Sequence, residues 1–279
     1  MKRTKFMPEL PEVEVIRREL APLVINKIFA RPLLHIDSTV EYPEPDKFEA
    51  DLAGREISGV ERKGKYLIFR LDRGILVVHL RMTGNLIFSE KGQLNNERFL
   101  RLSLPFNDGS ALYFFDMRRF GRVWLVDNDA ELEEIVFKRV GPDIMNDVNC
   151  DDFLRLLDQK KKRQLKALLL DQSCAAGMGN IYTDECLFRC GVHPRRTVGE
   201  LTPVEAEKLF DAVQTVLEEG IEYGGTTFRD YKNARGALGE FQSHLNVYGR
   251  KGELCSCGTP IEKSVVAGRG TYFCPKCQK

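Results

Sequence analysis

The chain carries two close pairs of cysteines near its C-terminus, and thiolates at such spacing bind metal. One residue separates Cys255 from Cys257, sixteen residues follow, and two residues separate Cys274 from Cys277. Two thiolate pairs joined by a loop of this length are typical of a structural zinc ribbon, in which the metal is tetrahedral and closed to substrate. A disulfide-linked hairpin is the alternative, which the lack of an evident secretory signal disfavours. We therefore expect these four cysteines to hold one structural Zn²⁺.

Basic side chains surround the cysteines. Arg250 and Lys251 precede them, and Lys263 and Arg269 lie between the two pairs. The stretch Gly268-Arg269-Gly270 predicts a β-turn that directs one arginine outward, where a guanidinium could enter a DNA groove. A solubilising turn residue fits the same spacing equally well.

Two kinds of segment must position these groups. Short stretches rich in Val, Ile, Leu and Phe, separated by Gly-containing turns, predict strands at residues 66–71, 75–80, 85–89, 99–104, 111–115 and 121–126. Helical periodicity is present at residues 11–20, 151–158, 164–171, 180–190 and 203–223. This order predicts an α+β protein with an N-terminal antiparallel sandwich or barrel of hairpins, followed by helices and a Gly- and Cys-rich hairpin at the end. The expected domains are residues 8–140, 150–240 and 246–279.

Composition narrows the class of protein. With 43% apolar and 30% charged residues, the chain is neither disordered nor fibrous. No apolar stretch approaches the roughly 20 residues that span a bilayer, and Pro8-Glu9-Leu10-Pro11-Glu12 follows the charged start where a signal peptide would be apolar. The formal net charge of +1 hides an uneven distribution, because residues 127–152 are acidic and residues 229–279 are basic. We expect a cytoplasmic protein without a membrane partner.

Seven ordered motifs resemble those of the formamidopyrimidine-DNA glycosylase family, which repairs oxidised purines. The motifs are MPELPEVE at residues 7–14, KGKYL at 63–67, HLRMTG at 79–84, DMRRFG at 116–121, GMGNIY at 177–182, GGTT at 224–227 and VYGRKGE at 247–253. The cysteine ribbon follows them, so the resemblance covers nearly the whole chain. It implies an α+β fold with an N-terminal antiparallel β-sandwich and a C-terminal helix-two-turns-helix module that carries a β-hairpin zinc ribbon. Leu10 stands where the related enzymes for oxidised pyrimidines typically have glycine, which points to the purine branch.

The resemblance implies a chemistry for the N-terminal motif. In this family the amine of an N-terminal proline attacks the deoxyribose and forms a Schiff base, so Pro8 is the implied nucleophile. Glu9 would protonate the opening sugar, and Glu12 would orient the amine. Lys65 would contact the phosphate beside the lesion and assist elimination. Taken singly, each acid would be read as an ordinary cap of a helix N-terminus.

Pro8 departs from the family pattern, because seven residues precede it. The nitrogen of an internal proline is an amide whose lone pair is delocalised, and it cannot attack a sugar. We expect either that translation begins at Met7 and the methionine is removed, or that a protease removes the extension. A protein that keeps the extension would not be a lyase.

The resemblance also assigns residues to DNA binding. Met82, Arg118 and Phe120 would fill the space that an extruded base leaves in the duplex. Phosphate contacts fall to Lys65, His79, Asn180, Tyr248, Lys263 and Arg269. Lys166 resembles a DNA-binding lysine of the family's helix-two-turns-helix module. Residues 224–240 resemble the loop that closes over a flipped 8-oxoguanine.

The resulting hypothesis is a bifunctional DNA glycosylase with AP-lyase activity in base excision repair. It would excise 8-oxoguanine and formamidopyrimidines from double-stranded DNA, cut abasic sites by β,δ-elimination, and work as a monomer associated with the nucleoid. Two alternatives stay open: a damage-binding protein that does not catalyse, and a glycosylase for oxidised pyrimidines. A nicking assay on damaged duplexes separates the three.

Overall fold

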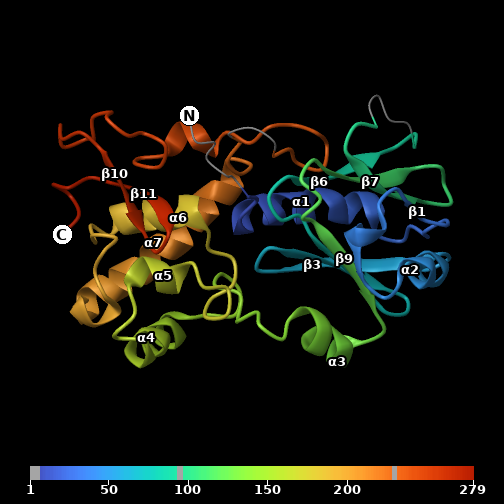
Figure 1. Ribbon diagram of the computed structural model, residues 1–279, viewed down its shortest axis with the longest axis horizontal. Coiled ribbons are helices and arrows are strands. Elements are labelled where there is room, and N and C mark those ends of the chain that lie inside the picture. Colours follow the sequence, from blue (N-terminus) through green and yellow to red (C-terminus); the bar gives the residue numbers. More distant parts are fainter. Residues whose placement is uncertain (1–6, 93–96, 228–230) are drawn as a thin grey trace. The chain divides into compact units, whose positions relative to one another are not determined.

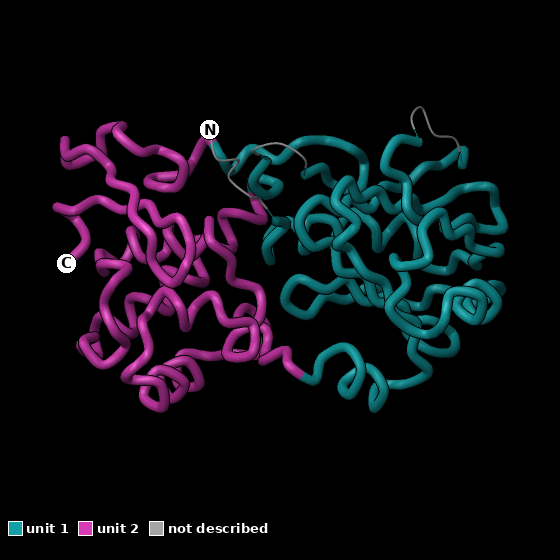
Figure 2. The backbone as a smooth tube through the Cα atoms, viewed as in Figure 1, with its two compact units in different colours: residues 1–138, 223–242 teal, residues 139–222, 243–279 magenta. Residues whose placement is uncertain are grey.

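The computed structural model describes residues 7–92, 97–227 and 231–279. Two compact units divide the chain, one formed by residues 1–138 and 223–242 and the other by residues 139–222 and 243–279 (Figure 2). The segment 223–242 therefore belongs with the first unit, whereas the sequence placed it in the helical domain 150–240. The reason is long-range packing, because Tyr231 and Ala234 are buried in the core of the first unit.

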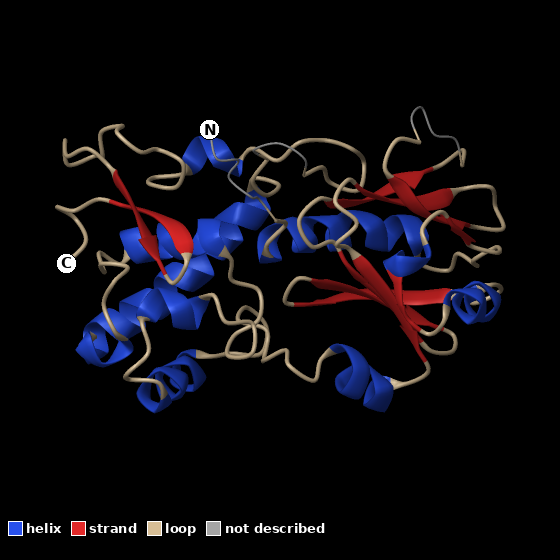
Figure 3. Cartoon of the chain, viewed as in Figure 1, coloured by secondary structure: helices blue, strands red, loops and turns tan. Residues whose placement is uncertain are grey.

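Two β-sheets make up the first unit (Figure 3). The five-stranded sheet has the order β2 (Val40–Tyr42), β9 (Arg122–Val126), β5 (Ile75–His79), β4 (Tyr66–Leu71) and β3 (Ile57–Lys63). The four-stranded sheet has the order β1 (Leu33–Leu34), β7 (Leu100–Pro105), β8 (Ala111–Asp116) and β6 (Gly84–Ser89). The predicted antiparallel sandwich is confirmed, except that β2 pairs with β9 in parallel.

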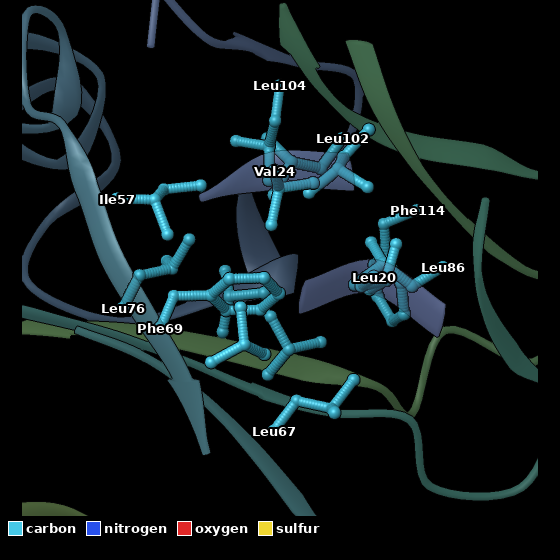
Figure 4. Close-up of a cluster of buried hydrophobic side chains, with 14 of the residues drawn as sticks. Leu20, Val24, Ile57, Leu67, Phe69, Leu76, Leu86, Leu102, Leu104 and Phe114 are labelled. Carbon is cyan, nitrogen blue, oxygen red and sulfur yellow. The ribbon is translucent and has the colours of Figure 1, made fainter. Parts of the chain in front are cut away.

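Helix α1 (Leu10–Val24) lies between the two sheets (Figure 1). Its apolar residues at helical spacing are fully buried, and they pack with leucines and phenylalanines from both sheets, such as Phe69 of β4 and Phe114 of β8 (Figure 4). Pro11 suits the start of a helix because the first N–H groups have no partner within it. The unit also contains α2 (Pro45–Leu52), α3 (Asp129–Glu131), a π-turn at Leu132–Val136 and a 3₁₀ turn at Asp37–Thr39.

The second unit is helical and ends in a hairpin. Its helices are α4 (Cys150–Gln159), α5 (Leu165–Leu169), α6 (Asn180–Arg189) and α7 (Pro203–Glu222), with 3₁₀ turns at Val198–Glu200 and Phe241–His244, the latter spanning the boundary between the units. Strands β10 (Glu262–Val266) and β11 (Arg269–Phe273) form the hairpin. Its turn is Ala267-Gly268, both at positive φ, rather than the predicted 268–270. Arg269 is consequently the first residue of β11. In the described part of the chain, no helix is long and apolar enough to cross a membrane.

Candidate active site and zinc centre

The N-terminal motif lies at the start of α1. Pro8 and Glu9 are buried, and the backbone N–H of Glu9 donates a hydrogen bond of 2.7 Å to Oε2 of Glu12. The other oxygen of Glu12 accepts 2.7 Å from the backbone N–H of Thr226. The Tyr231 hydroxyl donates 3.3 Å to the carbonyl of Glu12. Glu12 thus joins the start of the helix to the segment 223–242 within the same unit.

Lys65 lies in the turn between β3 and β4 and is only 4% exposed. The positive φ of Gly64, +56°, makes this tight turn possible. Arg62 donates from Nη1 to the Gly64 carbonyl (3.0 Å) and from Nε to Oε2 of Glu14 on α1 (3.0 Å). The turn that carries Lys65 is therefore fixed to the helix that carries the N-terminal motif.

The charge of Glu14 stabilises this connection. Burial alone would raise the pKa of Glu14, but hydrogen bonds from Arg17 and Arg18 and the charge of Arg62 lower it to about 2. The carboxylate is therefore ionised at neutral pH, and the almost fully buried Arg62 has a counterion.

His79 ends β5, and its ring makes an edge contact with Tyr66 (4.4 Å between ring centroids). Burial, together with the charges of Arg81 and Lys65, holds the pKa of His79 well below its usual range. Its Nδ1 accepts 2.9 Å from the backbone N–H of Arg81, which assigns the remaining proton to Nε2. His79 is therefore a neutral imidazole with one ring N–H left to donate, and its side chain is buried.

The three residues that the sequence assigned to an emptied base position lie together. Nη1 of Arg118 is 3.2 Å from Sδ of Met82, and the guanidinium stacks over the Phe120 ring at 4.6 Å. Phe120 is 45% exposed although it is apolar. A pocket of about 530 Å³ adjoins them, lined by Met7, Glu41, Arg81, Met82, Phe120, Arg122 and Trp124. An exposed aromatic ring beside a pocket is a common feature of binding surfaces.

Asp116 binds the loop that carries Arg118 and Phe120, a contact that is not evident from the sequence. It ends β8, is 1% exposed, and accepts hydrogen bonds from the backbone N–H groups of Arg118, Phe120 and Gly121. An aspartate directly before a loop that contains glycine is the signal that could have identified it, because its carboxylate can accept from N–H groups two to five residues further on.

In the second unit, Asn180 and Tyr248 lie against the hairpin. Asn180 begins α6, and its amide donates 2.9 Å to the Gly270 carbonyl and 3.4 Å to the Tyr248 hydroxyl. Two backbone N–H groups, of Val247 and Tyr248, donate to the buried Glu185. Lys263 donates 2.8 Å to the Tyr272 hydroxyl, and both Lys263 and Arg269 are exposed. These two cations are therefore accessible to a phosphate.

The structure does not support the DNA contact that the resemblance implied for Lys166. This lysine is fully buried and forms an ion pair with Asp184, and it donates 2.8 Å to the Thr271 hydroxyl on β11. Burial raises the pKa of Asp184 to about 7, against the opposing effect of Lys166. The prediction failed because a lysine next to a basic run is expected to be solvated. Here its charge is instead paired with Asp184 inside the unit.

The four cysteines of the ribbon converge as predicted. Their sulfurs all lie within 4.8 Å of one another, with 3.8 Å between Cys255 and Cys277 and 3.6 Å between Cys257 and Cys274. A tetrahedral Zn²⁺ with Zn–S bonds of about 2.3 Å requires S···S distances of about 3.8 Å. Hydrogen bonds from Thr259 lower the pKa of Cys257 to about 6, whereas hydrogen bonding to the neighbouring thiols raises that of Cys277 to about 12, as expected for thiols crowded at one point. The residues fit one structural zinc.

Comparison with known proteins agrees with this geometry. Residues 7–123 match the formamidopyrimidine-DNA glycosylase N-terminal domain, residues 140–232 the H2TH domain of the same proteins, and residues 256–279 a zinc finger found in FPG and IleRS. The formamidopyrimidine-DNA glycosylases of Bacillus licheniformis and Enterococcus faecalis are each 42% identical to the chain over 98% of its length, covering 100% and 98% of those proteins.

Solved structures resemble the whole chain as well. A Lactococcus lactis FPG mutant in complex with Fapy-dG containing DNA superposes with a TM-score of 0.89 at 36% identity, covering 98% of this chain and 100% of that one. The Lactococcus lactis Fpg bound to abasic site containing DNA gives 0.88 at 35%, with the same coverage. Because identity exceeds one third along nearly the entire length, the likeness extends beyond the fold. The chain belongs to the formamidopyrimidine-DNA glycosylase family.

Proposed function

We propose that this protein is a bifunctional glycosylase and AP lyase that removes oxidised purines, 8-oxoguanine and formamidopyrimidines, from double-stranded DNA. The observation that carries the proposal is the arrangement at the start of α1, where Pro8 and Glu9 are buried and Glu12 binds the backbone of both Glu9 and Thr226. Relatives of the same fold that hold Fapy-dG and abasic DNA support the substrate class.

In the proposed reaction, the residues at the start of α1 act in sequence. The free amine of Pro8 adds to the anomeric carbon, and the damaged base leaves with the electrons of the glycosidic bond. Glu9 protonates the ring oxygen, the bond between that oxygen and the anomeric carbon breaks to leave the C4′ hydroxyl, and the lone pair of the proline nitrogen forms the iminium ion. Removal of the C2′ proton then expels the 3′ phosphate, and a second elimination expels the 5′ phosphate. Lys65, in the turn that Arg62 fixes to α1, would stabilise the phosphate charge.

DNA binding in this proposal uses both units. Met82, Arg118 and Phe120 would occupy the place of the extruded nucleotide, and His79 would donate to a phosphate as a neutral group. In the second unit, Asn180, Tyr248, Lys263 and Arg269 would contact the backbone around the lesion. The zinc would keep the hairpin that carries Lys263 and Arg269 folded. We expect a monomer that acts on nucleoid DNA in the cytoplasm.

The proposal requires that Pro8 be a free amine, which an internal proline cannot be. The similarity to the family begins at residue 7, so a chain that starts at Met7 and loses it would present the correct terminus. Borohydride reduction traps the iminium ion as a covalent protein–DNA adduct. The form that begins at Pro8 should be trapped on 8-oxoguanine duplex, and an intact chain that begins at Met1 should not.

Pro8→Gly and Glu9→Gln variants of the shorter form serve as controls. Glycine retains a terminal amine and should keep some trapping, whereas Glu9→Gln should lose base excision. Equal trapping by both wild-type forms would exclude Pro8 as the nucleophile.

A second candidate, a damage-binding protein without catalysis, is favoured by one observation, namely the internal position of Pro8. It predicts tight binding to an abasic-analogue duplex with no nicking by either form. Side-by-side nicking of 8-oxoguanine and thymine-glycol duplexes separates the proposed purine specificity from a pyrimidine specificity.

A further inference from the structure

Two neighbouring loops of the first unit carry the residues that would enter the duplex. Residues 80–83 connect β5 to β6 and include Met82, while residues 117–121 connect β8 to β9 and include Arg118 and Phe120. The pairing of β6 with β8 places Gly84 opposite Asp116, so the two loops emerge side by side.

The carboxylate of Asp116 binds both loops at once. Oδ1 accepts from the Thr83 hydroxyl in the first loop and, at 3.0 Å, from the backbone N–H of Arg118 in the second. Oδ2 accepts from the N–H groups of Phe120 and Gly121, each at 2.7 Å. Four donors on a carboxylate that is 1% exposed form a complete set of partners for an ionised aspartate.

Two backbone carbonyls of the second loop are also hydrogen-bonded. Arg122 donates 3.0 Å to the carbonyl of Arg119 and 2.8 Å to that of Gly121, and its own Nε binds Glu41 at 2.8 Å. Arg119 has a positive φ of +60°, which is unfavourable for a residue other than glycine and persists only where the surroundings impose it. A Cβ on Gly121 would lie 2.3 Å from the Phe114 ring, so the loop also packs tightly against this side chain of β8.

We infer that Asp116 is a positioning residue that joins the two loops into one rigid wedge. The inference rests on the proposed function, because it concerns how Met82, Arg118 and Phe120 enter the base stack. Unstacking a base step costs free energy, and a wedge already fixed in its inserted shape avoids the further cost of ordering two loops. Asp116 touches neither the sugar nor the damaged base in this role.

The test compares Asp116→Asn and Thr83→Val with wild type, using the form that begins at Pro8. Asparagine keeps the shape of aspartate but turns an N–H₂ group toward two N–H donors, and valine removes only the hydroxyl that links the loops. The matched control is Asp143→Asn in the second unit, since Asp143 is also buried and its carboxylate accepts from the backbone N–H groups of Met145 and Asn146.

Three measurements separate a loss of loop positioning from a nonspecific loss of protein structure. Single-turnover excision of 8-oxoguanine from a duplex should fall at least about tenfold in Asp116→Asn and less in Thr83→Val, as expected for lost hydrogen bonds to a charged acceptor. Lyase activity on an abasic site in single-stranded DNA, which has no stack to hold open, should change less than about threefold. The fluorescence of 2-aminopurine beside the lesion should rise more slowly on mixing. Asp143→Asn should leave the ratio of the first two activities unchanged.

The inference is overturned if Asp116→Asn lowers excision and single-strand lyase activity equally, or lowers neither. If Asp116→Asn does not fold, the ratio of duplex excision to single-strand lyase activity is measured in Thr83→Val instead. The 2-aminopurine signal reports unstacking and does not depend on base excision. It therefore distinguishes failure of the wedge inference from failure of the proposed function. If the wild-type protein everts the base but does not excise it, the proposed function is contradicted. The 2-aminopurine signals of wild type and Asp116→Asn can then still be compared to test the wedge.

Discussion

Replacing Glu14 with glutamine tests how the helix of the N-terminal motif is held to the turn of Lys65. The Glu14 carboxylate accepts 2.8 Å hydrogen bonds from Arg17 and Arg18 of its own helix and 3.0 Å from Arg62 of β3. The Arg62 side chain is only 1% exposed, so Glu14→Gln would replace the carboxylate that faces its buried charge with a neutral amide.

The magnitude follows from the pKa of Glu14, which falls from 4.5 to about 2. At roughly 1.36 kcal/mol per pKa unit this difference corresponds to about 3.4 kcal/mol of stability at neutral pH. Solvent screens part of it, because Arg17 and Arg18 are 28% and 57% exposed, and we expect a loss of about 2 kcal/mol in Glu14→Gln. Since folding lowers this pKa, the stabilisation is complete above the unfolded value of 4.5 and disappears as pH falls through about 2.

Urea denaturation followed by circular dichroism at pH 7, 5 and 3.5 measures the effect. The difference between wild type and Glu14→Gln should be about 2 kcal/mol at pH 7 and should shrink below pH 4.5. Glu61→Gln is the control, because Glu61 accepts 2.9 Å from Arg70 but is half exposed, and its loss should cost less than about 0.5 kcal/mol. A difference that is constant with pH, or no larger than that of the control, would refute the reasoning.

Three further predictions concern separate parts of the protein. Gly220→Ala should lower the free energy of unfolding by about 2 kcal/mol in thermal denaturation, because its Cβ would lie 2.4 Å from the fully buried ring of Tyr182. Native mass spectrometry should find one zinc in wild type, and Cys257→Ser should release it to a chelator faster, because three thiolates remain. Glu19→Ala should speed tryptic cleavage beside Ala234, because Glu19 accepts a 2.9 Å hydrogen bond from that N–H.

Each of these has a clear contrary result. For the glycine, an unchanged melting temperature would mean that the ring moves aside without cost. For the cysteine, equal rates of zinc release would remove it from the ligand set. For the glutamate, unchanged proteolysis would show that the segment is anchored by its apolar contacts alone.

Much of the fold was predictable because local patterns agreed with the final packing. The strand predicted at 66–71 matches β4, and the helix predicted at 203–223 matches α7 to within one residue. Strand β3 escaped notice because Arg62 and Lys63 break its apolar pattern, although Arg62 is buried by its pairing with Glu14. Charged residues with a distant partner do not show their burial in sequence.

The site was predictable where a residue acts through its own chemistry. The sulfurs of Cys255 and Cys277, and the trio of Met82, Arg118 and Phe120, do converge. Asp116 was missed because its partners are backbone N–H groups, which every residue has. Lys166 was misassigned because its partner Asp184 comes from another helix, and single-sequence reasoning contains no information about that contact.

The path of the chain has a consequence for how the protein is made. Residues 223–242 complete the first unit, yet the ribosome produces them only after most of the second unit. Until they emerge, the N–H-accepting oxygens of Glu19 and one oxygen of Glu12 lack their partners from this segment, and the core sites of Tyr231 and Ala234 stand empty. The nascent β-sandwich therefore cannot finish folding during its own synthesis. The first unit is completed only by a segment that follows the 84 residues 139–222, so a product truncated before residue 223 would lack the partners of Glu12 and Glu19.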